Sequence, residues 1–211
     1  MPRNRKNIVF DLDGTILSST PFYHAILESI FQKNGLSLTD EDKALASGLS
    51  AKTFLSPRLS QQSLDDALRY LVEQSERDLH EIPVFEGFYE LLHLLKQRGC
   101  RLAVWTSRDR DSALTLLKKN SLDHYFDLVI AADCVSKHKP DPEGLSRISD
   151  QFGCGMEDVL MIGDHDVDVL AARAAGAMII RANWHGFRVG QTCNLGSITA
   201  HSVAELADYL S

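Results

Sequence analysis

Apolar residues form short continuous runs in two parts of the chain, with amphipathic segments between most of them. The runs occupy residues 8–10, 101–105, 128–131, 159–162 and 177–180. Each is too short for a typical helix and carries β-branched or aromatic side chains, so each predicts a buried strand. From residue 83 onward, strands alternate with segments of helical periodicity. Apolar strands that alternate with amphipathic helices predict an α/β protein with a doubly wound parallel sheet covered on both faces.

The segment from residue 18 to 82 follows a different pattern, because its apolar residues recur at helical spacing throughout. Thr20 and Pro21 suit the start of a helix, and the sequence Ser47-Gly48-Leu49-Ser50 interrupts a second one. We therefore expect a Rossmann-like core made of residues 1–17 and 83–211. A small all-helical cap, residues 18–82, is inserted after the first strand.

Composition and charge narrow the function classes. The chain has 211 residues and a formal net charge of −7, which argues against a nucleic-acid partner. Its four cysteines form no C-x-x-C pair, which favours a reduced, cytoplasmic setting. No apolar run is long enough for a membrane span or a signal-peptide core. We expect a cytoplasmic protein with no nucleic-acid or membrane partner, as a monomer or a homodimer.

The first strand ends in the stretch Asp11-Leu12-Asp13-Gly14-Thr15, which organises the candidate chemistry. Alternation along an extended backbone directs Asp11 and Asp13 to the same side. Two close carboxylates repel unless a cation lies between them, and their oxygens suit Mg²⁺. Gly14 permits a tight turn and a close approach of the backbone to a ligand. The same stretch also fits an acidic turn exposed to solvent.

Other polar residues follow the later strands. Thr106 and Ser107 follow the second predicted strand, Lys139 begins a helix after the third, and Asp164 follows the fourth. Right-handed crossovers bring the carboxyl ends of parallel strands to one edge, where ligands bind. Thr106 and Ser107 also suit the N-cap of the next helix, and Lys139 also fits a basic, solvated turn.

The motifs together resemble the haloacid dehalogenase-like superfamily, in its phosphoglycolate-phosphatase-like branch with a helical cap. The resemblance covers essentially the whole chain, and it rests on Asp11 to Thr15, on Thr106, on Lys139-Pro140-Asp141-Pro142 and on Gly163-Asp164 with Asp168 four residues on. It implies that Asp11 is a nucleophile that forms an aspartyl-phosphate and that Asp13 is the general acid and then the general base.

The resemblance assigns the remaining roles as well. Thr106 would hydrogen-bond the phosphoryl oxygens, and Lys139 would neutralise charge between nucleophile and phosphate. Mg²⁺ would be held by Asp11, the main-chain carbonyl of Asp13 and Asp164, with Asp168 supporting that metal site. Backbone amides near Gly14 and at Ser107 suit a phosphate cradle. Lys52 in the helical cap fits a substrate contact, and it also fits a solvated face.

These implications lead to a Mg²⁺-dependent phosphomonoester hydrolase that acts on a small phosphorylated metabolite. A β-phosphoglucomutase-like phosphomutase is the alternative, and Thr15 favours the phosphatase because such mutases often carry Val there. A dehalogenase would leave Asp13 without a role. A phospho-receiver module is disfavoured by the helical insert of about 65 residues, because receivers are compact single sheets.

Overall fold

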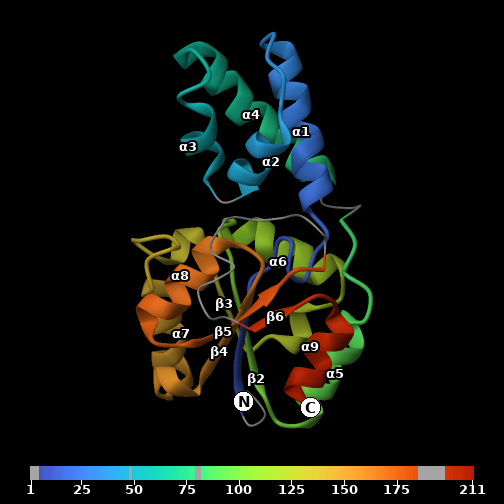
Figure 1. Ribbon diagram of the computed structural model, residues 1–211, viewed down its shortest axis with the longest axis vertical. Helices are drawn as coiled ribbons and strands as arrows, with labels where there is room; N and C mark the ends of the chain where they lie inside the picture. Colours follow the sequence, from blue (N-terminus) through green and yellow to red (C-terminus); the bar gives the residue numbers. More distant parts are fainter. Residues whose placement is uncertain (1–4, 48, 79–81, 185–197) are drawn as a thin grey trace. The chain divides into compact units, whose positions relative to one another are not determined.

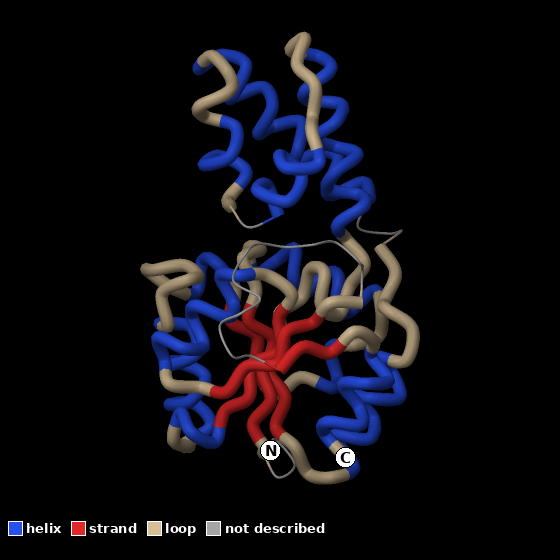
Figure 2. The backbone as a smooth tube through the Cα atoms, in the orientation of Figure 1, coloured by secondary structure: helices blue, strands red, loops and turns tan. Residues whose placement is uncertain are grey.

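The computed structural model describes residues 5–47, 49–78, 82–184 and 198–211 and divides into two compact units. One unit combines Met1–Ser18 with Pro83–Ser211, and the other is Ser19–Ile82. The first contains a sheet and its covering helices, whereas the described part of the second contains only helices and connecting loops (Figures 1 and 2).

The α/β unit contains a six-stranded sheet in its described residues, with strand order β3-β2-β1-β4-β5-β6 and every neighbouring pair parallel. Its strands are β1 (Asn7–Phe10), β2 (Arg101–Trp105), β3 (Leu128–Ile130), β4 (Val159–Gly163), β5 (Met178–Ala182) and β6 (Ile198–Ala200). Its helices are α5 (Phe88–Gln97), α6 (Arg110–Lys119), α7 (Glu143–Phe152), α8 (Asp166–Ala175) and α9 (Val203–Leu210), with 3₁₀ turns at Asp123–Tyr125, Ala132–Cys134 and Met156–Asp158.

The central strand β1 is buried on both faces. Val9 belongs to an apolar cluster with residues of α7 and α8, such as Leu145 and Val169. Phe10 points to the opposite face, where its ring meets that of Phe88 on α5 edge-on at 5.7 Å between centroids. Figure 1 shows α7 and α8 on one side of the sheet and α5 and α9 on the other. The predicted doubly wound parallel sheet is confirmed.

Three local features differ from the expectation. Strand β6 was not predicted, because Ile198-Thr199-Ala200 is a short run without a strong apolar signal. The segment Lys139–Pro142 predicts a helix with Asp141 as its cap, whereas α7 begins at Glu143, one residue later than that cap implies; the Asp141 carboxylate does accept the Glu143 N–H at 3.0 Å. Asp109, rather than Thr106 or Ser107, caps α6, because its side chain accepts the Ser112 N–H at 2.9 Å. The capping interpretation of Thr106 and Ser107 is therefore wrong.

The helical unit contains α1 (Thr20–Lys33), α2 (Asp40–Ser47), α3 (Ala51–Leu55) and α4 (Gln61–Asp78). Its apolar core includes Phe31 and Phe54, whose rings stack at 5.9 Å between centroids. The segments flanking this unit run side by side, since the Ser18 N–H donates to the Pro83 carbonyl at 2.9 Å. Whether the unit acts as a cap over the site stays a prediction.

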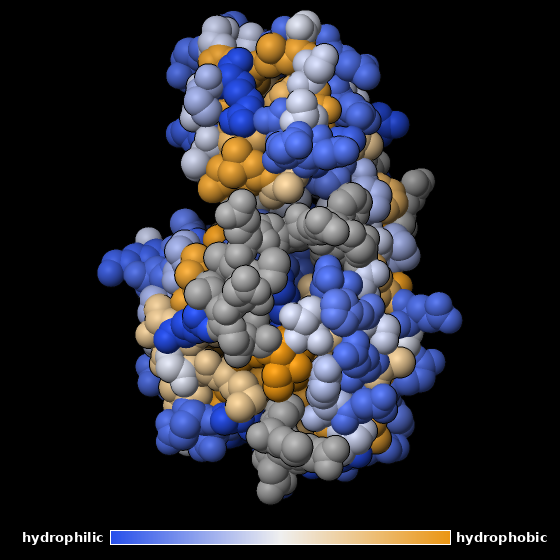
Figure 3. All heavy atoms as spheres, viewed as in Figure 1, coloured by the Kyte–Doolittle hydropathy of each residue, from blue (hydrophilic) through white to orange (hydrophobic). Residues whose placement is uncertain are grey.

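The surfaces drawn in Figure 3 are mostly hydrophilic, with apolar side chains between the polar ones. Within the described residues, no helix has the length and apolar composition needed to cross a membrane. Cys100, Cys134 and Cys154 carry free thiols, and Cys193 lies outside the described residues.

Candidate active site

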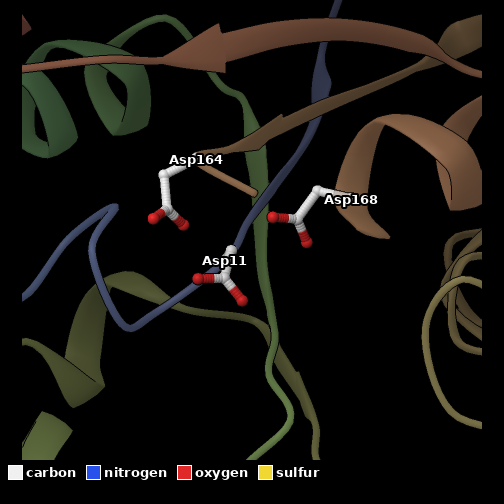
Figure 4. Close-up of side chains that lie close together, drawn as sticks. All are labelled: Asp11, Asp164 and Asp168. Atoms are coloured by element: carbon white, nitrogen blue, oxygen red, sulfur yellow. The ribbon is translucent and has the colours of Figure 1, made fainter. Parts of the chain in front are cut away.

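The carboxyl ends of β1, β2 and β4 bring the predicted site residues together. Asp11 continues β1, because its N–H donates to the Ile162 carbonyl of β4 at 2.8 Å. Thr106 continues β2 in the same way, with its N–H on the Ile130 carbonyl at 3.0 Å. Figure 4 shows the side chains of Asp11, Asp164 and Asp168 close to one another at this edge. The sheet therefore positions the site through ordinary parallel pairing.

Lys139 lies at the centre of this cluster. Its Nζ is 2.7 Å from Asp11 Oδ1, 2.7 Å from Asp168 Oδ1 and 2.7 Å from the main-chain oxygen of Trp105. The Lys139 side chain is only 2% exposed. Burial lowers the pKa of Lys139, but the Asp11 and Asp168 carboxylates raise it by more, so that it lies above its ordinary value. The ammonium is therefore charged at neutral pH.

Three buried carboxylates lie close together, and two of them, Asp11 and Asp168, contact that single ammonium. Asp11, Asp164 and Asp168 each offer an oxygen within 4.8 Å of the other two. Burial raises the pKa of Asp11, Lys139 lowers it, and the Asp168 and Asp164 carboxylates raise it, with a net shift well above the usual range. Within this cluster, one positive charge faces three potential negative charges. A small divalent cation with a preference for oxygen ligands, such as Mg²⁺, fits this imbalance.

Gly14 and Thr15 fix the Asp164 carboxylate. The Thr15 hydroxyl donates a hydrogen bond to Asp164 Oδ1 at 3.3 Å, and Thr15 is fully buried. Gly14 has a φ of +77°, and a Cβ on it would collide with Asp164 Oδ2. Only glycine meets both conditions without strain. The turn after β1 thus carries candidate catalytic groups and also shapes the pocket for the carboxylate that follows β4.

Asp168 differs from Asp164 in how its oxygens are used. Its Oδ2 accepts the His165 N–H at 3.0 Å, which closes a capping box at the start of α8, and its Oδ1 contacts Lys139. Asp168 is 1% exposed. Because both oxygens already have protein partners, Asp168 is suited to support the metal site by orienting Lys139 and the loop that carries Asp164.

Asp13 has a partner that the sequence analysis missed. Arg108 forms a two-point ion pair with its carboxylate, with Nε 2.6 Å from Oδ2 and Nη2 2.8 Å from Oδ1. Burial lowers the pKa of Arg108, but the charge and hydrogen bond of Asp13, together with the charges of Asp109 and Asp11, raise it above its ordinary value. In the sequence, only the position of Arg108 indicated a role at the site, because it lies three residues past the end of a predicted strand and next to Thr106 and Ser107. A guanidinium in this geometry holds a carboxylate in one orientation.

Thr106 and Ser107 lie on the same edge of the sheet. Thr106 is buried, and its hydroxyl oxygen accepts the Arg108 N–H at 3.1 Å, so the hydroxyl proton can still be donated. Ser107 is exposed immediately after it. Lys52 belongs to α3 of the helical unit, and its substrate contact stays a prediction.

Comparisons with known proteins agree with this geometry. The family model described as "Haloacid dehalogenase-like hydrolase" matches residues 8–182. A phosphoglycolate phosphatase of Aliivibrio fischeri is 33% identical over 81% of this chain and 81% of its own length. Another phosphoglycolate phosphatase, from Rhodospirillum rubrum, is 29% identical over 97% of this chain and 90% of its own length. Pyrophosphatase PpaX of Halalkalibacterium halodurans is 28% identical over 80% of this chain and 79% of its own length.

A solved structure supports the fold. The haloacid dehalogenase-like family protein from Streptococcus pneumoniae superposes with a TM-score of 0.84, covering 97% of this chain and 98% of its own, at 23% identity. The family model covers well over half of the chain and includes the residues that follow β1, β2 and β4. The predicted resemblance is confirmed, and the chain belongs to the haloacid dehalogenase-like hydrolase family.

Proposed function

We propose that the protein is a Mg²⁺-dependent phosphomonoesterase that acts on a small phosphorylated substrate through an aspartyl-phosphate on Asp11. The observation that carries this proposal is the buried contact of Lys139 with Asp11, in a cluster that also contains Asp164 and Asp168. This arrangement combines a nucleophile, a fixed positive charge and a cation site. The phosphatase names of the relatives agree with it.

In the first half-reaction, an Asp11 oxygen attacks phosphorus, a new P–O bond forms, and the bond to the leaving alkoxide breaks. Lys139 lowers the repulsion between the carboxylate and the phosphate, and the Thr106 hydroxyl donates a hydrogen bond to a phosphoryl oxygen. Such preorganised contacts are each worth about 10²–10³ in rate. Asp13 protonates the leaving oxygen, so its carboxyl group must turn away from Arg108 at this stage.

In the second half-reaction, Asp13 takes a proton from water, and the water oxygen attacks the phosphorus. The P–O bond to Asp11 breaks, and inorganic phosphate leaves. Asp11, Asp164 and the Asp13 carbonyl would hold Mg²⁺, which supplies charge stabilisation to the phosphoryl group. Splitting one displacement into two steps is the advantage of the covalent route.

The test is phosphate release from a panel of phosphorylated metabolites, including phosphoglycolate, sugar phosphates, nucleotides and pyrophosphate. We expect turnover that EDTA abolishes and Mg²⁺ restores, and that Asp11→Asn abolishes. The exposed Asp123→Asn is the matched control and should keep full activity. Turnover that survives both EDTA and Asp11→Asn would refute the proposal, and sugar-phosphate isomerisation without phosphate release would favour the mutase.

A further inference from the structure

Trp105 contacts Lys139 in two ways. It is the last residue of β2 and is 1% exposed. Its main-chain oxygen accepts a hydrogen bond from Lys139 Nζ at 2.7 Å, and Nζ also lies 4.8 Å from the centroid of its ring. An ammonium within about 6 Å of an indole face is attracted to the ring electrons, most strongly when both groups are shielded from water.

The two contacts complement the charged ones. An ammonium has three N–H donors, and Lys139 has three oxygen acceptors near it, on Asp11, Asp168 and Trp105. The indole face adds attraction without occupying another donor. A lysine side chain has four flexible carbon–carbon bonds, so fixing its ammonium requires contacts from more than one direction.

Gly144 makes room for the indole. It lies in the first turn of α7, and a Cβ at this position would collide with the Trp105 side-chain nitrogen. The same turn directly follows the Lys139–Pro142 segment, so the helix that anchors the lysine loop also seats the ring. The large residue in β2 and the small residue in α7 are therefore matched to each other.

We propose that Trp105 is a positioning residue for Lys139, whose ammonium it holds between Asp11 and Asp168 for phosphoryl transfer. This inference rests on the proposed function, since the contact matters for catalysis only if Asp11 receives a phosphoryl group. It assigns the indole face a role in kcat rather than in substrate affinity, because Trp105 is buried behind the lysine and has almost no exposed surface.

A fluorinated tryptophan series separates electrostatics from packing. The chain has two tryptophans, so Trp184→Phe leaves Trp105 as the single labelled site. Each added fluorine withdraws ring electrons with little change in size. We expect kcat to fall about twofold per fluorine, with KM and the melting temperature unchanged. The control is a Trp105→Phe protein labelled only at Trp184, which should show no trend. A flat kcat across the Trp105 series would overturn the inference.

Substitutions give an independent test. Trp105→Leu should lower kcat about tenfold with KM within about twofold, whereas Trp105→Phe keeps an aromatic face and should lose less than half as much on a logarithmic scale. Gly144→Ala should lower kcat as Trp105→Leu does, and the double variant should lose no more than either single one. Additive losses would contradict the coupling between Trp105 and Gly144. If Trp105→Leu does not fold, the fluorinated series still decides.

A chemical readout keeps this inference separable from the proposed function. Acylation of Lys139 by an amine-reactive ester, followed by mass spectrometry, reports how firmly the ammonium is held without any substrate. We expect slow labelling in the wild type and labelling at least about fivefold faster in Trp105→Leu at an unchanged melting temperature. Equal labelling rates would overturn the inference. A wild type that labels slowly and yet hydrolyses no phosphomonoester would refute the proposed function instead.

Discussion

Replacing Lys139 by methionine tests the charge balance of the site most directly. The substitution keeps the length of the side chain and removes the ammonium from between Asp11 and Asp168. At 2.7 Å and an effective dielectric constant of about 20, each contact represents about 6 kcal/mol of attraction. Desolvation of the buried charges offsets most of this energy, and deleting one partner of a buried pair usually costs about 3–5 kcal/mol. We expect Lys139→Met to lower the free energy of unfolding by an amount in this range when it is measured in EDTA at pH 8.

The pH dependence of that loss has a defined sign. The pKa of Asp11 is already raised by burial and by its neighbouring carboxylates, and removing Lys139 raises it further. A group whose pKa is higher in the folded state than in the unfolded state stabilises the folded protein. This stabilisation is complete at pH values below the pKa of the unfolded state, and it is lost as the pH rises through the pKa of the folded state. Lys139→Met should therefore be less destabilising at pH 5 than at pH 8.

The assay is urea unfolding of both proteins in EDTA and in excess Mg²⁺, at both pH values. Added Mg²⁺ should restore part of the stability of the variant, because a ligand that binds only the folded state stabilises it. We expect phosphatase kcat to fall about 10²–10³-fold. Lys119→Met, a substitution on α6, is the matched control. A loss below about 1 kcal/mol that does not depend on pH would refute the reasoning.

Three further predictions use other contacts of the site and its loops. Gly14→Ala forces a methyl group onto Asp164 at a φ of +77°, so Mg²⁺ titration of activity should show at least about tenfold weaker activation. Hydrogen bonds from the Ser136 side chain and from the Ser136 and Lys137 N–H groups lower the pKa of Glu143 to about 2 from 4.5. The stabilisation of the protein by the Glu143 carboxylate is present above pH 4.5 and is lost as the pH falls toward 2. Glu143→Gln should therefore make the unfolding midpoint less dependent on pH between these two values. Arg108→Ala removes the two-point contact that Asp13 must leave before it protonates the leaving oxygen, so steady-state kinetics should show a kcat no lower than that of the wild type, whereas a loss of about tenfold or more would show that Asp13 acts while paired with Arg108.

The sequence predicted the elements that carry strong local patterns. The apolar runs 101–105 and 159–162 became β2 and β4, and Asp11 and Asp164 meet because parallel strands end at one edge. The pairing of Arg108 with Asp13 was not predicted, because a single charged residue after a strand belongs to no hydrophobic pattern that would indicate its partner. Asp13 already had the predicted role of general acid and base, and only the structure shows that Arg108 contacts it.

Packing relations between distant residues were also beyond the sequence. Nothing in the sequence near Trp105 indicates that Gly144, in a different element of the chain, makes room for its side chain. Strand β6 depends on pairing with β5 rather than on its own composition, with Ile180 opposite Ile198. Such features arise from tertiary contacts, which override weak local preferences.

The position of β1 in the sheet has a consequence for biosynthesis. Strand β1 ends at Phe10, but the two strands that pair with it begin much later in the chain, at Arg101 and Val159. Contacts so distant along the chain form slowly, whereas the local contacts of a helical segment such as Ser19–Ile82 form early. During synthesis, the apolar side chains of β1 therefore lack at least one of their two pairing strands until β4 has been translated.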